Sequence, residues 1–298
     1  MSWRTRVADA AVGLFSHAPD PLAATFDHPG DPGLFGPGSV TWRIMSDSST
    51  FIGGVRALLV QAAHPEVAAG VGDHSSYRAD PLGRLSRTAA YVTATAYGSL
   101  PEVDHAIGLV KRLHGPVSGM SHRGLAYSAS NPAMAAWVHN ALVDSFLVSY
   151  RTYGPSQVSA ADADAYVAEQ VRLGSRMGAD PLPDTADGLH RWIIGHPSLG
   201  SSPSGTDALG FLSGPPLDPM VRMAYRIIYD AAAATVPFEV RDVLGLEVPR
   251  GAVVRGRLLV RGLRVALGAS PAWAAALERC SEDRPAGVRF RNAPGTSR

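Results

Sequence analysis

Hydrophobic positions along the chain recur at the three-to-four-residue spacing of α-helices, and no clear period-two pattern of strands is visible. The helical pattern is nearly continuous from Trp42 to about Tyr153, where segments such as FIGGVRALLVQAAHPEVAAGV are rich in Ala, Leu and Val. It returns in SAADADAYVAEQVRLGSRMG, in DPMVRMAYRIIYDAAAA and in AVVRGRLLVRGLRVAL. In the first of these, Ser159 is suited to cap the helix and Asp162 suits its first turn. The pattern therefore predicts an all-α fold.

Two stretches depart from this pattern. Residues 17–41 contain several prolines and glycines and predict an irregular lead-in. Residues 195–219 are dominated by Gly, Pro and Ser and predict a loop, either a lid or a connector. The tail after Ser281 is expected to fray. No internal repeat or second domain is visible, so residues 1–298 are expected to form a single domain.

Composition narrows the class of protein. With 46% hydrophobic and 18% charged residues, the chain has the composition of an ordinary soluble globular protein. Its net charge of +1 gives no strong basic field for nucleic acid or an acidic membrane surface. The single cysteine, Cys280, excludes an internal disulfide and a cysteine-based zinc or iron–sulfur site. No signal peptide and no apolar window of roughly 20 residues is present. We expect a cytoplasmic protein, with no prediction of its oligomeric state.

One predicted helix carries a histidine on its apolar side. In SLPEVDHAIGLVKRLHGP, the positions Val103, Ile107, Val110 and His114 are spaced four, three and four residues apart and form one stripe. His114 is therefore expected to face inward at the last turn. The next residue, Gly115, lets a large group approach the backbone. Two interpretations stay open from the pattern alone: an iron ligand, or a core histidine hydrogen-bonded to a carbonyl.

The preceding predicted helix carries a polar stripe. In ADPLGRLSRTAAYVTATAYG, Asp80 is suited to cap the helix. Arg84, Arg87, Thr88 and Tyr91 lie at offsets of zero, three, four and seven residues and share one face. This face is either the solvated side of the helix or a set of polar groups above a cofactor, because arginine binds carboxylates bidentately.

The remaining candidates give weaker signals. His64 and His74, with Asp73 between them, do not have a recognised zinc spacing. His139 lies in a strongly apolar helix and is expected to be buried, with a supporting or structural role. No GxGxxG, P-loop or GxSxG pattern is present, which argues against nucleotide binding, phosphoryl transfer and serine hydrolysis. Three aromatic residues are assigned to the core: Tyr127, Trp137 and Tyr150.

Three motifs occur in the order seen in one known family. The run GGVRALLVQAAHPEVAAGVGDHSSYRADPLGRLSRT, then VKRLHGPVSG and then WVHNALVDSFL, resembles the MpaB-type oxygenases, which include the latex-clearing protein, a rubber oxygenase. The resemblance covers roughly Trp42 to Glu169. It implies an all-α protein with a globin-like helical core and one haem b. It also implies cleavage of a carbon–carbon double bond in an apolar isoprenoid chain by dioxygen, giving carbonyl products.

The resemblance also assigns roles to residues. The iron ligand of the family lies in the motif that matches RLHGPV, so His114 inherits that role and Gly115 leaves room for the porphyrin. Arg84, Arg87 and Thr88 match an arginine, a lysine and a threonine of the distal helix. They are expected to contact the propionates and to stabilise activated oxygen. Arg87 departs from the family's pattern, because it replaces a lysine that can coordinate iron in the closed resting form.

A guanidinium stays protonated and has no free lone pair, so Arg87 is not expected to bind iron. We therefore expect five-coordinate iron, or iron with water as the sixth ligand. The expected partners are an apolar small molecule and dioxygen, with no nucleic acid. Two alternatives remain: a haem peroxidase or peroxygenase, and a haem- or lipid-binding protein without turnover. A catalytic carboxylate is not assigned.

Overall fold

The structure is a computed structural model of the chain and describes residues 4–5 and 13–281. Most of these residues are helical, and the two strands that it describes form one short antiparallel hairpin, so the fold is all-α as predicted. The elements follow one another in this order: η1 (Thr25–Asp27), α2 (Val40–Met45), α3 (Thr50–Ala62), α4 (Pro65–His74), α5 (Pro81–Tyr97), α6 (Leu100–His114), β1 (Ser118–Met120), β2 (Ala126–Ser128), α7 (Pro132–Tyr153), α8 (Ala160–Met177), α9 (Ala186–Ile194), α10 (Pro203–Ser213), α11 (Pro219–Thr235), α12 (Phe238–Leu244), α13 (Ala252–Leu267) and α14 (Pro271–Cys280).

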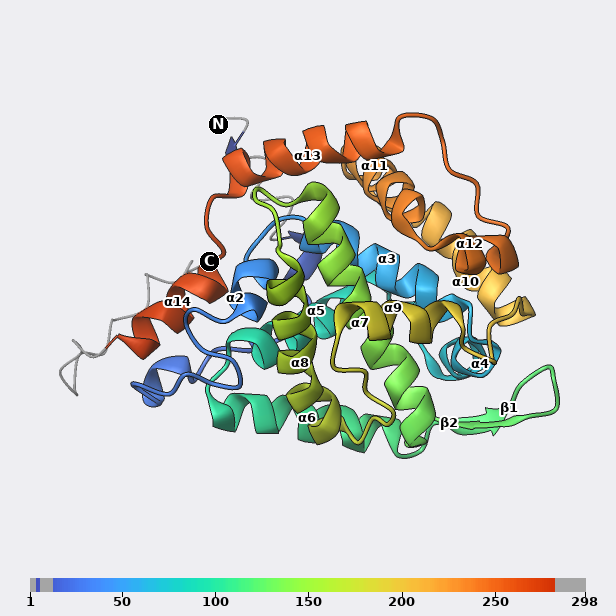
Figure 1. Ribbon diagram of the computed structural model, residues 1–298, viewed down its shortest axis with the longest axis horizontal. Helices are drawn as coiled ribbons and strands as arrows, with labels where there is room; N and C mark the ends of the chain where they lie inside the picture. The colour runs from blue at the N-terminus through green and yellow to red at the C-terminus, as the bar shows by residue number, and fades with distance from the viewer. Residues whose placement is uncertain (1–3, 6–12, 282–298) are drawn as a thin grey trace, which may run out of the picture.

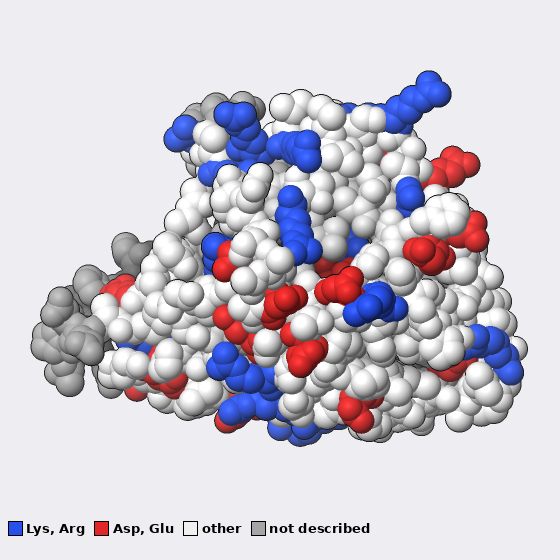
Figure 2. Space-filling view, in the orientation of Figure 1, with Lys and Arg blue, Asp and Glu red and all other residues white. Residues whose placement is uncertain are grey.

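The helices surround a central pair formed by α3 and α7 (Figure 1). Helices α11 and α13 pack along one side of this pair, and α8 and α9 pack against α7. In the view of Figure 1, α13 forms the upper edge, α6 forms the lower edge and the β1–β2 hairpin projects to the right. Both signs of charge are spread over much of the face shown in Figure 2. Within the described residues, every helix is too short or too polar to cross a lipid bilayer.

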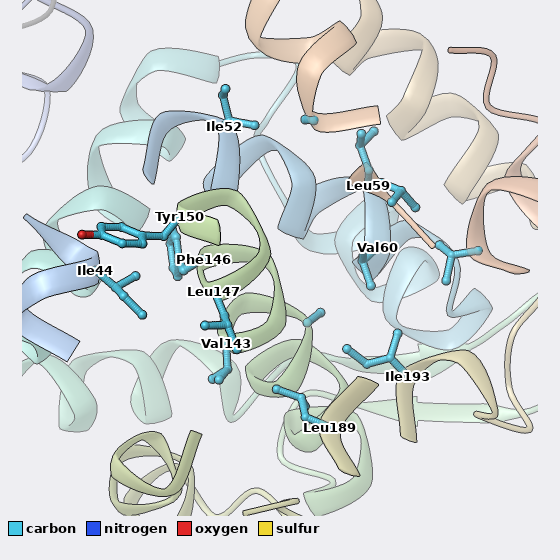
Figure 3. Packing of buried hydrophobic residues seen from close by; sticks show 14 of the residues in the cluster. Ile44, Ile52, Leu59, Val60, Val143, Phe146, Leu147, Tyr150, Leu189 and Ile193 are labelled. Atoms are coloured by element: carbon cyan, nitrogen blue, oxygen red, sulfur yellow. The ribbon is translucent and has the colours of Figure 1, made fainter. Parts of the chain in front are cut away.

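The main hydrophobic core lies between α3, α7 and α9. Figure 3 shows Ile52, Leu59 and Val60 of α3 beside apolar side chains of α7, with α9 closing one end. At Gly53, an added Cβ would lie 2.6 Å from a ring carbon of Phe146, so the close approach of α3 to α7 requires glycine. The labelled residues from α7 and α9 are Val143, Phe146, Leu147, Tyr150, Leu189 and Ile193.

A buried ion pair also joins the two central helices. Arg56 of α3 and Asp144 of α7 lie 2.7 Å apart, and their side chains are 1% and 4% exposed. Arg56 also donates hydrogen bonds to Ser145 Oγ at 2.7 Å and to the backbone carbonyl of Thr235 at 3.1 Å. The guanidinium thus connects α3, α7 and the end of α11. A buried charge is tolerated only with such partners.

Several predictions about local structure are confirmed. Helix α8 begins after Ser159, whose hydroxyl accepts a hydrogen bond from the backbone N–H of Asp162 at 3.0 Å. Residues 17–41 are irregular apart from η1 and the start of α2. The three aromatic residues assigned to the core are buried: Tyr127, Trp137 and Tyr150.

Two predictions about local structure are wrong. Residues 195–219 are not a continuous loop, because α10 occupies Pro203–Ser213. The Ser-Pro pair that suggested a loop is a helix start, in which Ser202 Oγ accepts a hydrogen bond from Gly205 N–H at 3.0 Å. The β1–β2 hairpin was not predicted, because its three-residue strands are too short to show alternation. The predicted fraying after Ser281 lies outside the described residues.

Candidate functional site

Helices α5 and α6 form a pair joined only by Gly98 and Ser99. Helix α5 begins as predicted, with Asp80 accepting a hydrogen bond from Gly83 N–H at 3.0 Å. Helix α6 begins with a capping box, in which Ser99 N–H donates to Glu102 Oε2 at 2.9 Å. Because the connection is short, the chain turns back, and the end of α6 lies near the beginning of α5. The pair is therefore closed at the Gly98 end and open at the other.

The two stripes predicted from the sequence face each other across this pair. Near the closed end, Tyr91 of α5 packs against the cluster that contains Val103 and Ile107 of α6, which are 0% and 6% exposed. At the open end, Arg84 of α5 lies near enough to His114 of α6 for its positive charge to act on the imidazole. The sequence predicted the two stripes, but not that they face each other.

His114 itself lies at the surface. The prediction that it faces the interior is wrong, because its side chain is exposed. The apolar cluster that buries Val103 and Ile107 does not extend to the last turn of α6. Partial burial of the ring, followed by the charge of Arg84, lowers the pKa of His114 below its usual value. The imidazole is therefore neutral at pH 7. No hydrogen bond or ion pair joins it to any residue that the structure describes.

The three polar residues of α5 that the resemblance singled out differ in their surroundings. Arg84 is half-buried and donates a hydrogen bond to Ser75 Oγ. Burial lowers the pKa of Arg84, as does the charge of Arg87. Arg87 is 51% exposed and forms an ion pair with Asp80 at 3.1 Å. Thr88 is exposed, and its hydroxyl donates to the backbone carbonyl of Arg84 at 3.0 Å. Of these three residues, Arg84 is the one whose charge lowers the pKa of His114.

Gly115 follows His114 as the C-cap of α6. Its backbone is in the ordinary right-handed region, with φ −49° and ψ −50°. A Cβ at this position would meet only backbone carbonyl oxygens, the nearest being that of Arg112 at 3.5 Å. Neither the backbone nor a neighbouring side chain therefore requires glycine here. Because Gly115 has no side chain, another group can come close to the backbone beside His114.

The same end of the helix pair exposes apolar side chains. Leu85 in the first turns of α5 is 38% exposed, and Leu109 and Leu113 in the last turns of α6 are 44% and 58% exposed. Single exposed leucines are common on protein surfaces. Here they lie in the same turns as a neutral histidine and a half-buried arginine. The open end thus combines apolar area with one nitrogen ligand and positive charge.

A haem fits this donor set better than a free metal ion does. In the described part of the chain, no three His, Cys, Asp or Glu side chains gather as a metal site would require. Haem iron is held by the porphyrin and needs only an axial ligand from the protein. A neutral imidazole could supply that ligand, an arginine could pair with a propionate and leucines could contact the macrocycle. These groups lie in the first turns of α5 and the last turns of α6, at the open end of the pair.

Two hollows of the surface lie elsewhere. One, of about 570 Å³, lies between the hairpin and α10 and is lined by His122, Ser202 and Asp207 among others. The other, of about 600 Å³, lies between α11 and α13 and is lined by Arg222, Arg226 and further residues. Neither is lined by the residues that the sequence singled out. The candidate site therefore rests on the chemistry of the α5–α6 pair.

Contacts that the sequence did not indicate hold the segment after Gly115 in place. Glu66 of α4 accepts hydrogen bonds from Ser121 Oγ at 2.8 Å and Arg123 Nε at 3.0 Å. Burial alone would raise the pKa of Glu66, but these bonds lower it overall. Asp73 accepts a hydrogen bond from the Tyr127 hydroxyl at 2.5 Å. Burial and this bond raise the pKa of Tyr127 to about 12. No pattern in the sequence indicated these pairings.

The two most buried candidate histidines are structural. His139 of α7 is 9% exposed, and its Nε2 lies 3.0 Å from the backbone carbonyl of Gln170. Burial lowers the pKa of His139 to about 4. His64 is 4% exposed, and its Nδ1 accepts a hydrogen bond from Val67 N–H at the start of α4. Burial, followed by the charge of nearby His196, lowers the pKa of His64 to about 4. The prediction that His139 is buried is confirmed.

These two histidines make the stability of the fold depend on pH. Their pKa is about 4 in the folded chain and 6.5 in the unfolded chain, so the unfolded chain binds more protons between these values. We expect the free energy of unfolding to fall by about 1 kcal/mol per histidine for each pH unit from 6.5 towards 4. Urea unfolding across this range measures the slope. His139→Gln should reduce the slope, and a slope equal to that of the wild type would contradict the assignment.

Comparison with known proteins gives one match. The family described as "ER-bound oxygenase mpaB/B'/Rubber oxygenase, catalytic domain" matches residues 42–265. This range contains both facing stripes of α5 and α6 and most of α13. No curated protein and no solved structure matches the chain. The globin-like arrangement of the core therefore stays a prediction.

Proposed function

The chain belongs to the family of mpaB and rubber oxygenase catalytic domains, and from this premise we propose that it is a haem b-dependent oxygenase. Its reaction is the cleavage of a carbon–carbon double bond in an apolar, isoprenoid-like substrate by dioxygen. The observation that carries the proposal is the position of Arg84 near the neutral imidazole of His114 at the open end of the α5–α6 pair, where the imidazole has no hydrogen-bond partner among the described residues.

Each residue of this face has a part in holding the cofactor. His114 would hold the haem iron through its imidazole, and Arg84 would keep the imidazole available, because the nearby positive charge disfavours its protonation. Arg84 is also placed to pair with a propionate. Gly115 leaves the approach to the backbone open, and Leu113 offers apolar contact. Bound haem supplies the iron at which dioxygen is activated.

The polar residues of α5 serve the oxygen side of the reaction. The guanidinium of Arg87 and the hydroxyl of Thr88 are hydrogen-bond donors at the open end of the pair. When such donors are free of their present partners, they would stabilise negative charge that develops on oxygen. Arg87 must first exchange its ion pair with Asp80, which costs little because both side chains are half exposed.

The reaction is balanced by its two substrates alone. One carbon–carbon double bond is broken and two carbon–oxygen double bonds are formed. Each oxygen atom of dioxygen enters one carbonyl product. No net proton is consumed or released, so any group that moves a proton during the reaction must return it by the end of the turnover. The protein's task is to bind the alkene, orient it and exclude water.

The test combines reconstitution with isotope labelling. We expect hemin to titrate to one haem per chain and, after reduction, the loaded protein to convert an isoprenoid alkene under ¹⁸O₂ into two carbonyl products that each carry label. Mass spectrometry of products trapped by reduction measures this. Turnover with hydrogen peroxide in the absence of dioxygen would instead indicate a peroxygenase. Stoichiometric haem binding without turnover would indicate a carrier.

A further inference from the structure

Helix α13 has apolar side chains on its outer face as well as on its inner face. Val254, Leu258 and Val265 are 58%, 66% and 50% exposed. Their spacing of four and seven residues places them within about 40° of one another on a helix with 100° per residue. The inner face is already occupied, because α13 packs against α11 and α7. It buries Ala252, Gly256 and Val260.

The charge along this segment has one sign. Between Glu247 and Glu278 the chain contains no aspartate or glutamate. Two arginines of this segment have acidic partners elsewhere: Arg255 pairs with Asp230 at 3.3 Å and Arg264 pairs with Asp47 at 2.5 Å. The exposed arginines of the segment form no ion pair with any described residue. They are Arg250, Arg257 and Arg261.

The exposed arginines and the apolar stripe share one surface. By helix geometry, Arg261 lies about 20° from the nearest edge of the stripe of Val254, Leu258 and Val265, and Arg257 lies about 60° from it. Figure 2 shows blue side chains gathered over α13, at the top of the view, with the red side chains of this face lying over other elements. The overall net charge of +1 therefore conceals a local basic and apolar face.

We propose that the outer face of α13 docks the protein onto an anionic lipid bilayer. A helix with apolar side chains on one face and arginines beside them lies in the plane of the membrane boundary. The apolar side chains enter the upper acyl region, while the long arginine stems let the guanidinium groups reach lipid phosphates. This inference stands on α13 alone and does not depend on haem binding at the α5–α6 pair.

Other occupants suit this face less well. In a two-fold dimer the same patch meets itself, so the arginines of one α13 would face those of the other without a nearby acid. A nucleic acid would satisfy the arginines but would leave the stripe of valine and leucine without an apolar partner. An anionic bilayer satisfies both kinds of side chain.

Vesicle sedimentation tests the proposal with the full-length protein. We expect the wild type to sediment with vesicles of phosphatidylcholine mixed with phosphatidylglycerol, and much less with phosphatidylcholine alone. Because each arginine near an anionic surface contributes on the order of 1 kcal/mol, Arg257→Gln combined with Arg261→Gln should weaken the partition coefficient roughly tenfold or more. Leu258→Gln should weaken binding to the same vesicles, and high salt should release the wild type.

The matched control removes two arginines elsewhere. Arg43→Gln combined with Arg191→Gln changes the net charge equally at exposed positions of α2 and α9 and should leave sedimentation unchanged. Equal Tm values would show that all variants are folded. The proposal is overturned if the wild type does not sediment with anionic vesicles, or if the α13 variants bind them as strongly as the wild type does. It also fails if light scattering shows a dimer that Leu258→Gln dissociates, because a second copy would then occupy the face.

Discussion

His114→Ala is expected to abolish the specific Soret band that hemin produces with the wild-type protein. Neutral imidazole is the nitrogen ligand proposed for the iron, and alanine offers none. The substitution should leave the fold intact, because the His114 side chain is exposed and has no hydrogen bond to a described residue. Titration of apoprotein with hemin, followed by absorbance, measures the effect, and thermal unfolding without hemin checks the fold.

The same helix provides the control. His105 is also exposed on α6, two and a half turns before His114, and His105→Ala should retain the wild-type band. Loss of the band in both variants would indicate damage to α6 and not removal of a ligand. Full haem occupancy in folded His114→Ala would show that the ligand assignment is wrong. The oxygenase family would still stand, because it rests on residues 42–265 as a whole.

Breaking the Arg56–Asp144 pair is expected to cause the largest loss of stability. Arg56→Met leaves the carboxylate of Asp144 buried without its partner, and this costs about 3–5 kcal/mol in the free energy of unfolding. Combining Arg56→Met with Asp144→Leu removes both charges and should recover most of the loss. Denaturant unfolding of the three proteins measures the difference.

An exposed ion pair supplies the comparison. Arg43 and Asp162 lie 2.9 Å apart with about two fifths of each side chain exposed, so Arg43→Gln should cost about 1 kcal/mol or less. If Arg56→Met cost no more than this, water would have to reach Asp144 in the folded state. The two central helices would then be less tightly closed than their buried side chains indicate.

Local signals in the sequence were sufficient to predict most of the long helices and the two stripes. Asp80 and Ser159 act through hydrogen bonds to residues three positions away, so their sequence context alone identifies them as caps. The exposure of His114 was not predictable in the same way. It depends on how far the cluster around Val103 extends along α6, which is a property of the packed helices. The hairpin was not predictable for the same reason, because it depends on contacts between distant segments. Arg123, between β1 and β2, donates a hydrogen bond to Glu66 of α4.

Two inferences were misleading because they rested on composition and not on the positions of residues. The Gly, Pro and Ser content of residues 195–219 concealed α10, although the order Ser202-Pro203 is that of a cap and a first turn. The net charge of the whole chain likewise gave no sign of the arginines on α13, because acidic residues elsewhere balance them. In both cases the order of residues along the helix was informative, whereas the total composition was not.

Because the candidate haem site lies at the open end of the α5–α6 pair, the protein is expected to fold before it binds haem. The residues proposed to hold haem lie outside the large cluster that joins α3, α7, α9 and α11. Purified apoprotein should therefore be a folded, storable starting material that is charged with hemin afterwards. A ligand that binds only the folded state raises Tm by mass action. Melting curves with increasing hemin would then report affinity directly, without a spectroscopic signal from the iron.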